Sequence, residues 1–167
     1  MKKEKIKIGN ILAILYGTDS DELYLFVHGK NSNKEEAEGF ANIVTELGCQ
    51  VLSFDLPEHG GRNDKQYKCS VQNGVHDLGL VYDFVKDKYK SISLYACSLG
   101  AYFSFVAYRN MLFRKSLFVS PILNMERLIS NMMQWSNITK EELKEKGEIE
   151  TSFGETLSWE YYEYVRA

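Results

Sequence analysis

Short apolar runs alternate with segments of helical periodicity over most of the chain. The first two runs flank Gly9-Asn10, a pair typical of hairpin turns, and apolar residues between the later runs recur every three or four positions. The runs predicted as strands are residues 5–8, 11–16, 22–28, 51–54, 92–95 and 117–119. The segments predicted as helices are residues 32–47, 71–89 and 99–111. This order predicts an α/β protein with a mostly parallel sheet and helices on both faces.

The pattern changes after Pro121. Helices are predicted at residues 125–135 and 139–146, and no further apolar strand follows them. We therefore expect a core domain over residues 1–123 and a helical region over residues 124–167. The large apolar side chains of the helical region suit either a substrate pocket or ordinary helix packing: Met125, Met132, Met133 and Trp135.

Composition and charge narrow the function classes. With 167 residues, 44% of them hydrophobic and 26% charged, the chain suits one well-buried domain. The net charge of −3 and the lack of a basic stripe argue against a nucleic-acid partner. No apolar run is long enough to span a bilayer, and the amino-terminal residues lack the pattern of a signal peptide. Cys49, Cys69 and Cys97 form no CxxC pair, so we expect no disulfide framework, no metal site and a cytoplasmic location.

A candidate nucleophile lies between the strand at residues 92–95 and the helix that follows it. Residues 96–100 read Ala-Cys-Ser-Leu-Gly, which matches the G-x-S-x-G nucleophile elbow with alanine at the first small position. Such a turn needs small residues two positions before and after the serine, and it lifts the hydroxyl clear of the sheet. The alternative is that Ser98 only caps the helix, as serine often does. Cys97 is predicted to be a small buried residue.

Two more motifs each follow directly after an apolar strand. His28-Gly29-Lys30 ends the strand at 22–28, and the sequence DLPEHG begins at Asp55, after the next strand. With the elbow at Ser98, these motifs resemble the α/β-hydrolase family, and the resemblance extends into a helical cap after the sixth strand. It implies that Ser98 attacks a small-molecule acyl substrate without a metal or organic cofactor. It also implies an oxyanion hole made by the backbone N–H groups of Lys30 and Leu99, supported by His28, Gly29 and Gly100.

The general base that such a serine needs is missing. In the family the order is serine, acid, histidine, yet the three histidines of this chain, His28, His59 and His76, all precede Ser98. The resemblance gives His28 a supporting role, the turn position of His59 suggests structural hydrogen bonding, and His76 falls on a helix. The family's last two strands, which lead to the acid and the histidine, are also absent. We therefore expect a truncated hydrolase whose remaining polypeptide is not represented here.

Two functions remain open from the sequence. The first is a serine esterase acting on carboxyl esters, thioesters or related acyl compounds, weak or inactive as these 167 residues alone. The second is a non-catalytic module of the same fold that binds a small molecule or a partner. Because the strand at 117–119 would be an uncovered apolar edge, self-association through it belongs to the second interpretation.

Overall fold

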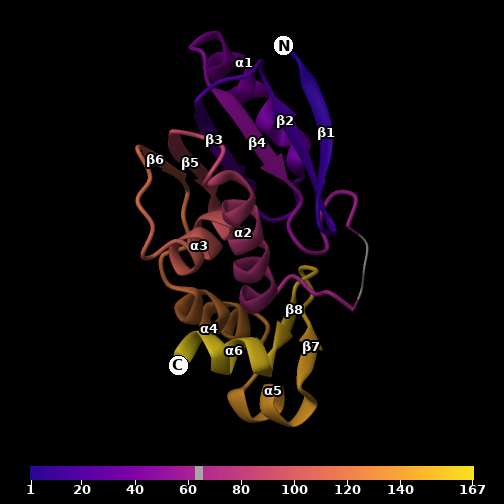
Figure 1. Cartoon of the computed structure of the whole chain (residues 1–167). Helices are drawn as coiled ribbons and strands as arrows, with labels where there is room; N and C mark the ends of the chain where they lie inside the picture. The colour runs from indigo at the N-terminus through magenta and orange to yellow at the C-terminus, as the bar shows by residue number, and fades with distance from the viewer. Residues whose placement is uncertain (63–65) are drawn as a thin grey trace. The chain divides into compact units, whose positions relative to one another are not determined.

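The computed structural model describes residues 1–62 and 66–167, which form two compact units, Met1–Pro121 and Ile122–Ala167 (Figure 1). The first unit contains a six-stranded sheet in the order β1-β2-β4-β3-β5-β6. Its strands are β1 (Lys3–Ile8), β2 (Ile11–Tyr16), β3 (Glu22–Val27), β4 (Gln50–Phe54), β5 (Ser91–Cys97) and β6 (Ser116–Val119). β1 pairs antiparallel with β2, and β2 pairs antiparallel with β4. The remaining neighbours, β4 with β3, β3 with β5 and β5 with β6, are parallel. The predicted α/β class and mostly parallel sheet are confirmed.

One face of this sheet is covered by a short 3-10 turn, η1 (Lys34–Ala37), and helix α1 (Glu38–Glu46). Phe40 of α1 packs against aromatic rings of β3 and β5, with its ring centroid 5.9 Å from Phe26 and 4.8 Å from Tyr95. Ala37, Ala41 and Val44 join the same apolar cluster. Burial of this cluster fixes which side of β3 and β5 faces α1, because alternate residues of a strand lie on opposite faces.

The other face carries α2 (Val71–Val85) and α3 (Ser98–Ala107), which lie side by side in Figure 1. They approach closely at Gly74, where an added Cβ would lie 2.4 Å from the ring of Phe103. The hydroxyl of Tyr108, just after α3, donates to the Leu78 carbonyl at 2.9 Å and ties the two helices together.

The helices are shorter than their periodicity predicts. The first begins as the 3-10 turn, with Asn33 as its cap, before α1 starts at Glu38. The second ends at Val85 rather than residue 89, because the exposed residues 86–88 offer no apolar side chain to the core. The third ends at Ala107 rather than residue 111, since Tyr108 turns inward to bond α2.

The two edges of the sheet differ in chemistry. The edge strand β1 reads KEKIKI, and its charged residues are exposed. The other edge, β6, reads SLFV and carries no charge, and the side chain of Leu117 is 49% exposed. Charged residues are the usual protection of an edge strand against pairing with another chain, and β6 has none.

The second unit contains α4 (Met125–Trp135), α5 (Lys140–Lys146), a two-stranded antiparallel sheet of β7 (Glu148–Glu150) and β8 (Thr156–Ser158), and α6 (Trp159–Arg166). The predicted helices α4 and α5 are confirmed, whereas the β7–β8 pair and α6 were not predicted. Each of these strands has three residues and one apolar side chain, too few to show a period. Met125 and Met133 are buried within this unit, while Trp135 is 63% exposed and its ring lies near Phe153.

Candidate functional site

Ser98 lies at a sharp turn between a strand and a helix. β5 ends at Cys97 and α3 begins at Ser98, whose φ of +46° falls in the left-handed region. An L-residue with a side chain rarely adopts this conformation, and such strain is concentrated at functional sites. A serine that served only as an ordinary helix cap would have an extended backbone, as Ser70 has at the start of α2 (φ −108°, ψ 165°).

The small residues around Ser98 have a steric reason. A Cβ added at Gly100 would lie 2.2 Å from the carbonyl oxygen of His28 and 2.9 Å from that of Val27. These contacts are far inside van der Waals range, and they involve backbone atoms that cannot rotate away. Ala96, at the first small position of the motif, is completely buried. The start of α3 is therefore packed directly against the end of β3.

The loop after β3 passes beside the serine. A Cβ added at Gly29 would lie 3.4 Å from Cβ of Ser98 and 3.6 Å from the carbonyl oxygen of Cys97. Lys30 follows directly and is exposed. Leu99 is the second residue of α3, so its N–H belongs to the first turn, where helix N–H groups have no intrahelical partner. The sequence motifs at Gly29 and Ser98, which are far apart along the chain, are thus brought together.

His28 is fully buried and joins two loops through its ring. Its Nδ1 lies 2.7 Å from the Gly29 carbonyl, and its Nε2 lies 3.1 Å from the backbone nitrogen of Leu56. A carbonyl oxygen can only accept, so Nδ1 carries the proton and Nε2 accepts the Leu56 N–H. Burial lowers the pKa of His28 and keeps this ring neutral. Both ring nitrogens are therefore occupied by backbone groups.

Neither His59 nor His76 is placed to act as the general base for Ser98. His59 Nδ1 lies 2.8 Å from the Pro57 carbonyl, and the His59 ring centroid is 5.3 Å from that of His28. His76 is exposed on α2. Within residues 1–62 and 66–167, none of the three histidines is hydrogen-bonded to Ser98.

The buried carboxylate of Asp55, just after β4, organises the second loop of the site. It accepts hydrogen bonds from the Lys34 backbone at 2.9 Å, from Lys34 Nζ at 2.9 Å and from the Gly61 backbone at 3.0 Å. Burial acts against the charged form of Lys34, yet the hydrogen bond to Asp55 raises its pKa overall. Gly60 leaves no room for a side chain, since an added Cβ would lie 2.2 Å from the Asp55 carboxylate. Asp55 thus fixes η1, which begins just after the Gly29 loop.

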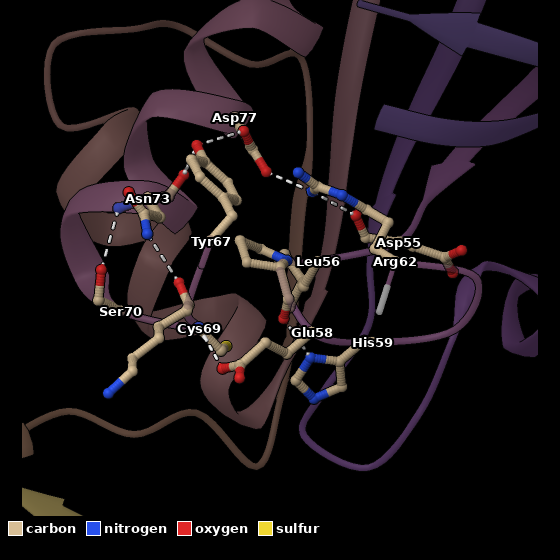
Figure 2. Close-up of polar contacts among 12 residues, drawn as sticks. Asp55, Leu56, Glu58, His59, Arg62, Tyr67, Cys69, Ser70, Asn73 and Asp77 are labelled. Atoms are coloured by element: carbon tan, nitrogen blue, oxygen red, sulfur yellow. Dashed lines mark hydrogen bonds and ion pairs between the residues drawn. The ribbon is translucent and has the colours of Figure 1, made fainter. Parts of the chain in front are cut away.

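A second polar group ties the same loop to α2 (Figure 2). Arg62 donates to the Asp55 carbonyl at 3.0 Å and forms an ion pair with the buried carboxylate of Asp77. Tyr67 donates to the other oxygen of Asp77 at 2.8 Å, and burial together with this bond raises the pKa of Tyr67 to about 12. Glu58, with a φ of +60°, accepts the Cys69 N–H at 2.6 Å. Sequence reasoning missed these roles because the two residues of each pair lie 6 to 21 positions apart and show no local pattern.

Cys97 was predicted to be buried and is instead half-buried. It lies on the same face of β5 as Tyr95, and burial followed by the nearby charge of Glu36 raises the pKa of its thiol. The thiol is therefore kept in its protonated form, which is a poor nucleophile.

The chain matches no protein-family model and no curated protein sequence. Solved structures match it over nearly its whole length. A protein of Agrobacterium vitis S4 assigned as a hydrolase aligns with a TM-score of 0.77 and 16% identity over 99% of this chain and 71% of its own. The esterase Est1E of Butyrivibrio proteoclasticus aligns with a TM-score of 0.74 and 17% identity over 98% and 70%. Mouse alpha/beta hydrolase domain-containing protein 10 aligns with a TM-score of 0.72 and 15% identity over 99% and 70%. The chain therefore has the α/β-hydrolase fold, as its motifs predicted.

No group of three or more His, Cys, Asp or Glu side chains in the described parts of the chain is placed to hold a metal ion. No helix there is both long and apolar enough to cross a membrane.

Proposed function

We propose that this chain carries the nucleophile and the oxyanion hole of a serine hydrolase that acts on a carboxyl ester, thioester or related acyl compound. Ser98 Oγ attacks the acyl carbonyl, and the backbone N–H groups of Lys30 and Leu99 donate to the oxygen as it becomes negative. The observation that carries the proposal is the left-handed backbone of Ser98 at the tip of β5.

The oxyanion hole rests on two features of the first unit. The Gly29 loop lies within van der Waals range of Ser98, and the N–H of Lys30 is the next one along that loop. The N–H of Leu99 belongs to the first turn of α3, whose dipole favours negative charge. In this scheme His28 and Gly100 are positioning residues. The His28 ring links the Gly29 loop to the loop after β4, and Gly100 leaves room for the start of α3 against the end of β3.

The proton of Ser98 Oγ needs a general base oriented by a carboxylate. The ring nitrogens of His28 are both occupied, and neither His59 nor His76 is bonded to the serine in the part of the chain the structure describes. We therefore propose that the base and its acid come from polypeptide outside these 167 residues. Residues 124–167 are proposed to be a cap region, as the sequence pattern predicts.

The test uses the natural full-length protein and a fluorophosphonate, which phosphonylates an activated serine. One adduct is expected, located by peptide mass spectrometry on Ser98 and lost in the Ser98→Ala variant. The Ser116→Ala variant, which changes an exposed serine of β6, should label normally. A folded protein that takes no label, or takes it at another residue, would rule out the proposed nucleophile.

The edge strand β6 supports a second candidate, a non-catalytic binding module that associates with itself through this strand. The observation in its favour is the contrast between the charged edge β1 and the uncharged, half-exposed β6. Light scattering of residues 1–167 after gel filtration would then give a dimer, which the Leu117→Lys variant converts to a monomer. A monomer at all concentrations would exclude this interpretation.

A further inference from the structure

A cavity opens at the end of the main sheet opposite to Ser98. Its volume is about 190 Å³, and its lining includes residues at or beside the starts of β3, β4, β5 and β6. The amino ends of parallel strands share one edge of a sheet, while Ser98 follows the carboxyl end of β5. The cavity is therefore separate from the candidate hydrolase site, and nothing in the proposed reaction uses it.

We propose that this cavity binds a small organic carboxylate, whose charged group is held by Arg114 and Lys115 and whose apolar body lies against Leu47. The three residues all line the cavity. The inference rests on an unpaired hydroxyl in the lining, on the charge balance at the rim and on the size of the apolar part.

The unpaired hydroxyl belongs to Ser93 of β5. Its residue is only 4% exposed, and it forms no side-chain hydrogen bond with any residue in the ranges 1–62 and 66–167. Its oxygen is not among the described side-chain atoms that are both fully buried and unpaired, so the cavity reaches it and its partner comes from outside the protein, as water or a ligand. A ligand oxygen in the cavity would supply it.

The rim carries an excess of positive charge. Both oxygens of Glu22 are engaged, one by Arg114 and the other by the thiol of Cys49, whose Sγ lies 3.6 Å away. Lys115 has no ion pair within the described residues. Because Glu22 offsets only one of the two cations, a carboxylate is the group that the rim would attract. The remaining guanidinium N–H groups of Arg114 and the ammonium of Lys115 are both suitable donors to it.

The apolar wall sets the size of the ligand. Leu47, just after α1, is 77% exposed, and Val44 lies one helical turn before it. A closed protein cavity of roughly 150 Å³ holds benzene, so the present volume suits a body of about six to nine non-hydrogen atoms. A ligand of this size would cover Leu47 and shield Cys49 from solvent.

The test uses benzoate as the probe and follows alkylation of Cys49 by iodoacetamide, measured peptide by peptide. With a Kd of about 1 mM, benzoate at about 10 mM would occupy roughly nine-tenths of the sites and slow the alkylation of Cys49 roughly tenfold. Cys97 and Cys69 are internal controls whose rates should not change. Benzyl alcohol, which has a similar shape and no charge, should protect Cys49 at least several-fold less.

Two variants complete the test. Lys115→Gln removes one rim cation and should weaken benzoate binding roughly tenfold, whereas Lys88→Gln, an exposed lysine outside the lining of the cavity, should not. Ser93→Ala should weaken binding without altering the alkylation rate of Cys49 in the absence of benzoate. Three results would each overturn the proposal: no protection of Cys49, equal protection by benzyl alcohol, or unchanged affinity in Lys115→Gln. None of these readouts depends on Ser98, so the outcome is independent of the proposed hydrolase activity.

Discussion

Replacing Gly100 with alanine tests how closely α3 approaches the end of β3. The new methyl group would lie 2.2 Å from the His28 carbonyl oxygen, 2.8 Å from Cγ1 of Val27 and 2.9 Å from the Val27 carbonyl oxygen. Overpacking of this kind costs about 1–3 kcal/mol, and contacts with backbone belong at the upper end because no rotamer relieves them. The same change gains about 1 kcal/mol of helix propensity. We therefore expect a net loss of about 2 kcal/mol in the free energy of unfolding.

Gly79 provides a matched control within the same unit. It lies in the middle of α2, and a Cβ there would meet no atom within 4 Å. Gly79→Ala should therefore keep the full helix-propensity gain and raise the free energy of unfolding by about 0.5–1 kcal/mol. The two alanine substitutions are chemically identical, yet the structure predicts opposite signs for them.

Urea unfolding followed by far-ultraviolet circular dichroism measures both effects. With a slope of about 2 kcal/mol per M, the midpoint should fall by about 1 M in Gly100→Ala and rise by a few tenths of 1 M in Gly79→Ala. The melting temperature should move in the same directions, by roughly 2–4 °C for each kcal/mol. If Gly100→Ala were as stable as the parent protein, α3 would not be packed on β3 as described, and the steric account of the elbow would be wrong.

Three further predictions concern His28, the carboxylate of Asp55 and the exposed edge strand. Burial lowers the pKa of His28, so below about pH 6.5 the unfolded state binds a proton on this imidazole while the folded state does not. The free energy of unfolding should therefore fall as the pH drops further. Urea titrations between pH 7 and 5 should show a smaller dependence of this free energy on pH in His28→Gln. Asp55→Asn leaves the ammonium of Lys34 without its buried partner and should cost about 3–5 kcal/mol, whereas Asp21→Asn, in an exposed ion pair, should leave the melting temperature nearly unchanged. Leu117→Lys places a charge on β6 and should reduce light scattering during refolding; equal scattering by the two proteins would show that this edge does not drive association.

Much of the first unit could be predicted because its strands and helices have strong periodicity. The apolar residues 23–27 of the strand predicted at 22–28 and the elbow at Ser98 predicted both the sheet and the place of the turn, and these depend on neighbours in the sequence. The links that support the site depend on distant pairs instead. The bond between Asp55 and Lys34, and the approach of Gly100 to the His28 carbonyl, follow only from the order of strands in space. The cavity beside Ser93 could not be predicted either, because it is formed by the starts of four strands that share no motif.

The order of strands in the sheet also affects how the chain folds during synthesis. β3 is bordered by β4 on one side and by β5 on the other, and β5 is completed about 70 residues after β3. At a ribosomal rate of about 5–20 residues per second, one side of this apolar strand stays without its partner for roughly 4–14 seconds. During that interval the exposed backbone of β3 is a binding site for molecular chaperones and a risk for aggregation. Synonymous codons that slow translation between residues 28 and 97 should therefore lower the yield of folded protein without changing any residue of the finished chain.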